Sequence, residues 1–133
     1  MENITKKERD CLITIKESSN GPFPVRLKDL SASMNIKPPS VLEILTRLQE
    51  KGLIKKDRGM VALTDKGEET YKRIVMIHRT LEVLYSRSGI DANDACKKIG
   101  NFDFLVDYDD AKKISASIGN PKTCPHGKKI DGS

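Results

Sequence analysis

The stretch VRLKDLSASMNIKPPSVLEILTRLQEKGLI, residues 25–54, decides the fold because it predicts two helices joined by a tight turn. The first helix is expected from about Leu27 to Met34, and residues 35–37 form the turn. Two prolines suit the first turn of the second helix, apolar residues recur along it at helical spacing, and Gly52 fits its C-terminal cap. This is the helix-turn-helix pattern, whose second helix can enter the major groove of DNA.

A short hairpin is expected directly after the helix pair. Its first strand begins with residues 53–54, KKDRG forms a polar tip, and MVALT forms the second strand up to residue 64. A hairpin with a basic tip in this position is typical of a winged helix. We therefore expect a mainly α-helical fold with a small β-wing, in which residues 1–64 form a winged helix-turn-helix domain.

A further helix is predicted near the N-terminus. Thr5 and Glu8 have the spacing of a capping box, and apolar residues then recur at helical spacing up to Ser18. Such a helix would complete the core of the first domain.

Candidate DNA contacts lie on the helix pair and the hairpin. Basic side chains at the tip can neutralise phosphates and release counterions, although a charge run is more commonly a solvated surface. Ser40 can cap its helix or touch a base or phosphate, and Glu43 can accept from a cytosine amino group or serve only solubility. The complete set of candidates is Arg26, Lys28, Lys37, Pro39, Ser40, Glu43, Arg47, Lys55, Lys56 and Arg58.

The composition is that of a globular protein with a modest basic excess. Charged residues make up 32% of the chain, and 24 Lys and Arg face 19 Asp and Glu, which favours a polyanionic partner. The charged N-terminus and the lack of an apolar run of about 20 residues argue against a membrane segment, so we expect a cytoplasmic protein. The sequence shows no catalytic constellation, so neither an enzyme nor a small organic substrate is expected.

The second half predicts one long helix and two shorter ones. Thr64 can cap a helix from about Asp65 to Ser88, roughly 36 Å long at about 1.5 Å per residue, which is too long for one small core. Its apolar stripe must therefore meet the later helices or a second copy of the chain, and we expect residues 65–133 to form a helical dimerisation domain. The stripe comprises Tyr71, Ile74, Val75, His78, Leu81 and Tyr85.

Metal-ligand chemistry is suggested by His78 and Glu82, which lie four residues apart on one helix face. Alone, the pair is more often a half-buried histidine satisfied by a carboxylate than a metal site. A next helix, capped by Asp91 and continuing through ANDACKKIGNFDF, would bring one thiol and one carboxylate towards His78. The residues expected on that side are Cys96, Gly100, Asp103 and Asp107.

Two features near the C-terminus have explanations other than metal binding. The acidic run DYDD, residues 107–110, suits the positive N-terminus of a last helix that extends to about Ile118. Cys124 and His126 form at most half a metal site in an irregular tail.

Several segments together resemble the DtxR/MntR family of iron- and manganese-dependent repressors. They are the PPSV-containing stretch quoted above, RGMVALTDKG (58–67), IHRTLEVLYSRSGID (77–91) and GNPKTCPHGKKI (119–130). The resemblance implies a homodimeric, repressor-like transcription regulator that senses a divalent transition metal. A symmetric dimer would in turn favour a palindromic operator. It further implies the short form, without the SH3-like domain of longer members.

The resemblance also implies a ligand set with departures from the family pattern. His78 and Glu82 match ligand positions, Asp10 matches one in manganese-type members, and Cys96 replaces a histidine of an ancillary site. The family's diagnostic group of Cys or Glu, then Glu, then His corresponds here to Gly100, Asp103 and Phe104. The candidate ligands are Asp10, His78, Glu82, Cys96 and Asp103.

A thiolate ligand favours zinc, ferrous iron or cobalt over manganese. A bound ion would tie the first helix, through Asp10, to the dimerisation helices and so favour one spacing of the two halves.

Two alternatives remain open from the sequence. A metal-independent regulator could respond to oxidation through Cys11 or Cys96, since three widely spaced cysteines do not form a disulfide framework. A winged helix can also serve as a protein-interaction module that does not bind DNA.

Overall fold

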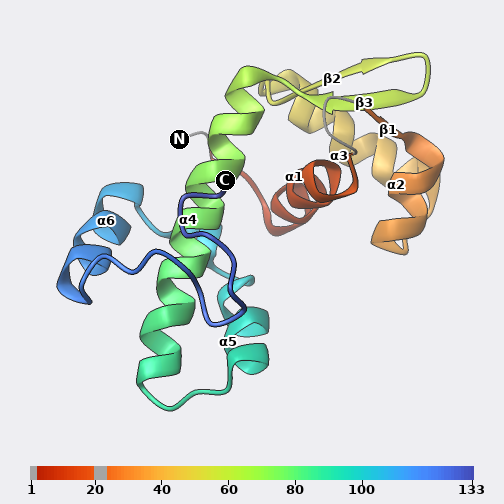
Figure 1. The fold of residues 1–133 in the computed structure, drawn as a ribbon. Coiled ribbons are helices and arrows are strands. Elements are labelled where there is room, and N and C mark those ends of the chain that lie inside the picture. Colours follow the sequence, from red (N-terminus) through yellow and green to blue (C-terminus); the bar gives the residue numbers. More distant parts are fainter. Residues whose placement is uncertain (1–2, 20–23) are drawn as a thin grey trace. The chain divides into compact units, whose positions relative to one another are not determined.

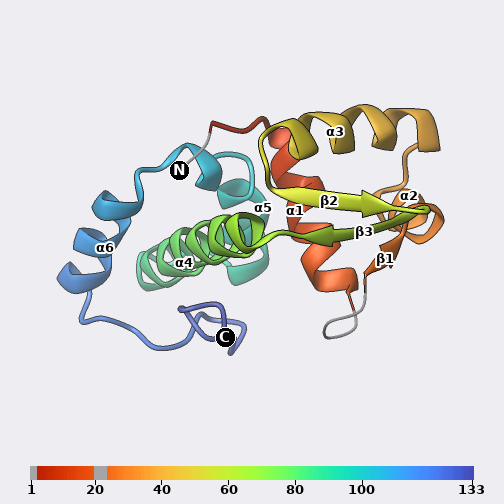
Figure 2. The same ribbon diagram turned by 90° about the horizontal axis from the view of Figure 1, so that it is seen from above.

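The computed structural model describes residues 3–19 and 24–133 (Figures 1 and 2). The chain divides into two compact units, one up to Tyr71 and one from Lys72 to Ser133. The boundary falls inside the longest helix, α4 (Asp65–Arg87), so this helix contributes residues to both units.

The first unit begins with helix α1 (Lys6–Ser18). Its predicted capping box is confirmed: the Glu8 backbone N–H donates to Thr5 Oγ1 at 3.2 Å, and the Thr5 N–H donates to Glu8 Oε1 at 3.2 Å. Two backbone donors that the helix leaves unpaired are thereby satisfied, which fixes where α1 begins.

The predicted helix-turn-helix is confirmed as α2 (Leu27–Met34) and α3 (Pro38–Glu50). The chain reverses at Asn35, whose φ of 54° is left-handed, a conformation that asparagine tolerates better than most residues. Helix α3 ends before Gly52, which has a φ of 76° and donates its N–H to the Gln49 carbonyl. The buried face of α3 consists of Val41, Ile44, Leu45 and Leu48.

A three-stranded antiparallel sheet completes the first unit, with strand order β1-β3-β2. Its strands are β1 (Val25–Arg26), β2 (Ile54–Asp57) and β3 (Met60–Leu63), and the pairing of β1 with β3 extends the predicted hairpin by one strand. Figure 2 shows β2 and β3 as a narrow ribbon beside α1 and α3.

The turn between β2 and β3 is shorter than the predicted five-residue tip. Arg58 and Gly59 both have positive φ angles, 50° and 77°, as in the two-residue turns that match the twist of a hairpin. Lys55 and Lys56 therefore lie in strand β2 and not at the tip.

Helix α4 begins and ends close to the predicted positions. Thr64 Oγ1 accepts the backbone N–H of Gly67 at 3.1 Å, which confirms the predicted cap, and Gly89 follows the helix with a φ of 88°. Gly67 is required by packing, because a Cβ there would lie 2.0 Å from the Leu53 carbonyl oxygen.

The prediction of one continuous helix from residue 92 to 104 was wrong. Helix α5 (Ala92–Ile99) stops before Gly100 and Asn101, two residues of low helix propensity, and a separate 3₁₀ turn, η1 (Asp103–Leu105), follows. Asp107 is the N-cap of α6 (Tyr108–Ser117), where its Oδ1 accepts the Asp110 N–H at 3.1 Å. Asp107 therefore does not share a helix face with Cys96, whereas the acidic run caps α6 as expected.

The later elements bury much of α4 within the chain itself. Ile77 and Leu81 of α4 pack with Ala95, Ile99 and Ala111 of α5 and α6 in one apolar cluster. Val83 packs with Cys124 and Ile130 of the tail in a second cluster. The predicted stripe missed Ile77 and Val83, which shows that α4 is covered on more than one side.

Candidate metal centre and nucleic-acid interface

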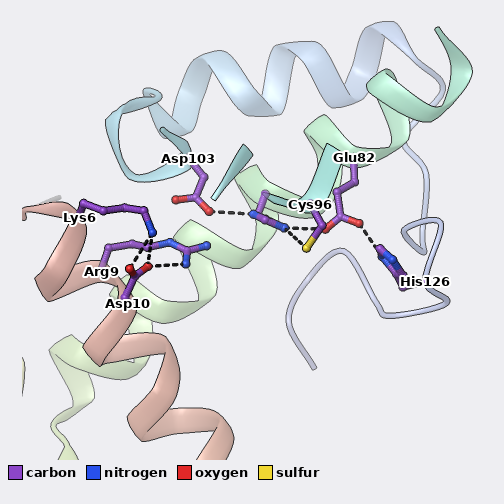
Figure 3. A network of polar contacts seen from close by, with 8 residues as sticks. Lys6, Arg9, Asp10, Glu82, Cys96, Asp103 and His126 are labelled. Atoms are coloured by element: carbon purple, nitrogen blue, oxygen red, sulfur yellow. Dashed lines mark hydrogen bonds and ion pairs between the residues drawn. The ribbon is translucent and has the colours of Figure 1, made fainter. Parts of the chain in front are cut away.

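His78 on α4 is the centre of a polar network in the second unit, and Figure 3 labels its partners Asp103, Glu82 and Cys96. Its Nδ1 lies 2.8 Å from Asp103 Oδ2, and its Nε2 lies 2.7 Å from Glu82 Oε1. Both carboxylates are buried: Asp103 is 0% exposed and Glu82 is 3% exposed. The helical spacing places Glu82 one turn from His78, and η1 supplies Asp103 from the other side of the ring.

Cys96 on α5 joins this network. Its Sγ lies 3.4 Å from His78 Nε2, so the expectation that Cys96 and Asp103 approach His78 is confirmed. The proximity of Asp103 results from the 3₁₀ turn and not from the continuous helix that the sequence pattern predicted.

The electrostatics favour a cation between these groups. Burial lowers the pKa of His78, but the hydrogen bonds to Asp103, Glu82 and Cys96 outweigh it and raise the pKa to about 10. Burial raises the pKa of Glu82, and its hydrogen bonds with His78 and His126 then lower it below its usual range. The groups around His78, chiefly the carboxylates of Asp103 and Glu82, therefore stabilise a positive charge at this position, which the protonated imidazole supplies.

The C-terminal tail brings a second group of donors to Glu82. His126 Nδ1 lies 2.9 Å from Glu82 Oε2, and His126 Nε2 lies 3.1 Å from Asn93 Oδ1. The buried thiol of Cys124 belongs to the same group. Cys124 and His126 were not among the predicted ligands, although their spacing of two residues was the feature that could have included them.

The two donor groups suit a thiophilic ion. His78, Glu82 and Cys96 form one group and Glu82, Cys124 and His126 the other, and within each group one ligand atom per residue lies within 4.8 Å of the others. A tetrahedral ion with bonds of about 2.0–2.3 Å requires ligand atoms roughly 3.4–3.6 Å apart. The Cys96–His78 separation of 3.4 Å already matches, whereas the His–carboxylate pairs, at 2.7 and 2.9 Å, need to move apart by about 0.5–0.9 Å.

Asp10 lies in the first unit and is paired in the described structure. Its carboxylate accepts from Lys6 Nζ at 2.7 Å and from Arg9 at 3.0 Å. A role for Asp10 as a metal ligand stays a prediction. Gly100 and Phe104 carry no metal-binding group at their family positions.

The structure does not favour Cys11 as a redox sensor. Its side chain is 0% exposed in the first unit, and burial, with a contribution from Asp10, raises the pKa of its thiol to about 12. A thiol that remains protonated is a poor nucleophile. Of the two cysteines named for a redox response, only the half-buried Cys96 remains a reasonable candidate.

All ten candidate DNA contacts are exposed in the first unit. Ser40 does not cap α3, because Lys37 holds the N-cap position and Ser40 is the third residue of the helix. Leu42, which was not among the predicted contacts, is 39% exposed on the same helix between Ser40 and Glu43. The exposed side of α3 therefore presents polar, charged and apolar groups together.

No helix in residues 3–19 or 24–133 is both long and apolar enough to cross a membrane.

Two family models together match nearly the whole chain. Residues 4–60 match the iron-dependent repressor N-terminal DNA-binding domain, and residues 64–132 match the iron-dependent repressor metal-binding and dimerisation domain.

Individual proteins agree with the family models. The chain is 33% identical over 108 residues to an uncharacterised HTH-type transcriptional regulator of Aeropyrum pernix, covering 79% of this chain and 59% of that relative. The crystal structure of the hypothetical protein SSo2273 from Sulfolobus solfataricus has a TM-score of 0.82 and 31% identity, covering 96% of this chain and 98% of that one. ScaR with bound Zn²⁺ has a TM-score of 0.78 and 26% identity, covering 92% of this chain and 58% of that one.

The family descriptions name a repressor with a DNA-binding domain and a metal-binding and dimerisation domain, which agrees with the predicted class of regulator. The winged helix, the donors around His78 and these matches lead to one conclusion: the chain belongs to the iron-dependent repressor family.

Proposed function

We propose that the protein is a homodimeric transcription regulator whose affinity for DNA depends on a divalent transition metal. In this division of labour, residues 1–64 contact the operator, and residues 65–133 hold the ion and the second copy of the chain. A protein with this function works where the DNA lies, in the cytoplasm.

The observation that carries the proposal is the buried group around His78. Glu82 and Asp103 flank the imidazole, and Cys96 reaches the nitrogen that also faces Glu82. Buried carboxylates beside a histidine and a thiol are costly unless a cation compensates them, and a divalent ion does so more fully than one proton. The related ScaR was crystallised with zinc, which agrees with this donor chemistry.

We assign separate roles to the four side chains. His78 Nε2, Glu82 Oε1 and Cys96 Sγ would hold the ion. Asp103 accepts from His78 Nδ1, which orients the ring and keeps Nε2 directed towards the other donors, as outer-sphere carboxylates do in metal proteins. A thiolate in this set selects zinc, ferrous iron or cobalt over manganese.

A bound ion would supply a concentrated positive charge that holds α4, α5 and η1 together at ligand distances. Binding of the ion would affect the affinity for DNA through α4, because this helix begins directly after the wing and also carries His78 and Glu82. An ion shifts the protein towards the DNA-binding conformation only by the difference in its affinity for the two conformations.

The DNA contacts follow from exposure and charge. Arg58 at the wing tip and Lys56 in β2 would neutralise phosphates, while Ser40 and Glu43 on α3 would meet base edges. Two symmetric copies would place their α3 helices about 34 Å apart and so read a palindromic operator.

The test measures binding of the full chain to DNA from upstream of its own gene, with zinc, ferrous iron or cobalt and with chelator. We expect at least tenfold tighter binding with the preferred ion, and loss of that difference in the His78→Ala variant. Asp109→Asn, an exposed carboxylate on α6, is the matched control and should behave as the wild type. Equal affinity in metal and chelator for the wild type would refute metal control.

A further inference from the structure

Helix α3 packs against α1 and β2 through one face, and its opposite face is turned away from them (Figure 2). Side chains three and four positions apart lie in rows along a helix. The exposed face of α3 carries two such rows side by side. One consists of Ser40, Glu43 and Arg47, and the other consists of Pro39, Leu42 and Thr46.

The two rows differ in chemistry. The first offers a hydroxyl, a carboxylate and a guanidinium group, all of which form hydrogen bonds. The second is apolar, because Pro39 and Leu42 have hydrocarbon side chains and the Thr46 hydroxyl donates to the Leu42 carbonyl at 2.8 Å. The helix backbone thus uses the polar group of Thr46, whose other side-chain branch is a methyl group.

Leu42 is the most informative member of the apolar row. Within the described residues of the first unit, it is the one large apolar side chain that is exposed. A single exposed leucine is ordinary on a protein surface. This one lies between Ser40 and Glu43, two candidate base contacts, and the same unit exposes the cations of Lys37 and Arg58. Leu42 therefore belongs to the surface that faces DNA in the proposed function.

The major groove of DNA offers one apolar partner to such a side chain. Among the four bases, only thymine presents a methyl group there, whereas the other groups on the base edges are hydrogen-bond donors and acceptors. An uncharged side chain without donors or acceptors pairs neither with a phosphate nor with those polar groups. Burying one methyl group against it increases binding affinity by about three- to fivefold.

We propose that Leu42 contacts the C5-methyl group of a thymine in the operator and so selects thymine at one position of each half-site. This inference rests on the proposed DNA-binding function and deepens it, because it assigns part of the base selectivity to a side chain that forms no hydrogen bonds. Ser40 and Glu43 read polar groups on the base edges, and Leu42 reads the neighbouring methyl group.

The test uses the full, metal-loaded chain and DNA from upstream of its own gene, in which footprinting locates the protected segment. Each thymine of that segment is replaced in turn by uracil, which lacks only the methyl group. We expect one position in each half-site at which uracil weakens binding of the wild type by about three- to fivefold. Leu42→Ala should weaken binding to the unmodified DNA by a similar factor and lose no further affinity with uracil at that position.

Two variants serve as controls, and circular dichroism establishes that each variant is folded. Leu42→Met keeps an apolar side chain of similar size and should retain the discrimination between thymine and uracil. Leu105→Ala changes the exposed leucine of the second unit and should bind as the wild type does.

The inference is overturned if no uracil substitution weakens binding of the wild type, or if Leu42→Ala keeps the full sensitivity to uracil. When metal still tightens DNA binding in either case, the proposed function survives and only this inference fails. A wild type that does not bind the duplex at all would overturn both.

Discussion

Glu8 is a buried charge whose ionised state depends on one partner. Both of its carboxylate oxygens lie 2.7 Å from Lys51 Nζ. Burial raises the pKa of Glu8, but the hydrogen bonds from Lys51 and Thr5 outweigh it and leave the pKa below its usual value. A carboxyl with a lowered pKa in the folded state stabilises the protein above its unfolded pKa, and this contribution is lost as the pH falls through the folded value.

We therefore predict that the free energy of unfolding falls between about pH 5 and pH 3, and falls less steeply in Glu8→Gln. At neutral pH the variant should be less stable by about 2 kcal/mol, because it leaves the half-buried Lys51 ammonium without its counter-ion. Urea denaturation followed by circular dichroism measures both effects. Glu50→Gln, at an exposed position on α3, is the control, and identical pH slopes for Glu8→Gln and wild type would contradict the assignment.

The cysteines should differ in reactivity. Cys96 is half-buried and its sulfur lies 3.4 Å from the cationic ring of His78, whereas Cys11 and Cys124 are buried. We predict that iodoacetamide alkylates Cys96 first in the folded, metal-free protein and that zinc protects it. Peptide mass spectrometry over time gives the order of labelling. Early alkylation of Cys11 would contradict the burial of its side chain in the first unit.

Individual residues were predictable where a short-range rule applies. The Thr5–Glu8 capping box and the His78–Glu82 pair follow from spacings of three and four along a helix, and the structure has both contacts. His126 was not predictable in this manner, because 44 residues separate it from Glu82 and only the folded tail brings them together.

At the scale of elements, the start of α4 packs closely against the backbone at Leu53, and Gly67 is the residue that allows this approach. A side chain at Gly67 would collide with the Leu53 carbonyl at 2.0 Å. Helix propensity alone predicts that Gly67→Ala stabilises the helix by up to about 1 kcal/mol. We predict the opposite sign, a loss of about 1–3 kcal/mol, because a backbone atom cannot move aside as a flexible side chain does.

Thermal and urea denaturation of Gly67→Ala measure this difference. Ser86→Ala, at an exposed position on the same helix, should change stability by less than about 0.5 kcal/mol. A stabilised Gly67→Ala protein would show that the backbone at Leu53 is free to shift.

Elements were predicted best where capping residues mark their ends. Thr5, Thr64 and Gly89 located the ends of α1 and α4 closely. The break between α5 and η1 was missed, because the apolar and polar spacing continues through Gly100 although the backbone does not. The wing tip was overestimated for a related reason: strand residues on a solvated edge, such as Lys55 and Lys56, look like loop residues in a sequence.

At the scale of the whole molecule, the sequence predicted the fold class and the family, but not the full ligand set. The donors come from α4, α5, η1 and the tail, so their assembly depends on tertiary packing that no local pattern contains. The same packing covers α4 within the chain. The apolar stripe of α4 is therefore weaker support for dimerisation than the sequence suggested, because residues of the same chain cover much of it.

The net charge of +5 and the exposed cations of the first unit predict how DNA binding responds to salt. Each phosphate neutralised contributes a slope of about −0.9 to the dependence of log affinity on log salt concentration. Arg58→Ala should therefore weaken binding to every DNA sequence and make the slope shallower by about one.

Glu43→Gln should instead keep the slope and change preference at one base pair, because it alters an acceptor that faces base edges. Fluorescence anisotropy with the metal-loaded protein, between about 50 and 200 mM salt, separates the two effects. An unchanged slope in Arg58→Ala would contradict the assignment of Arg58 to a phosphate, and an unchanged base preference in Glu43→Gln would contradict the assignment of Glu43 to a base edge.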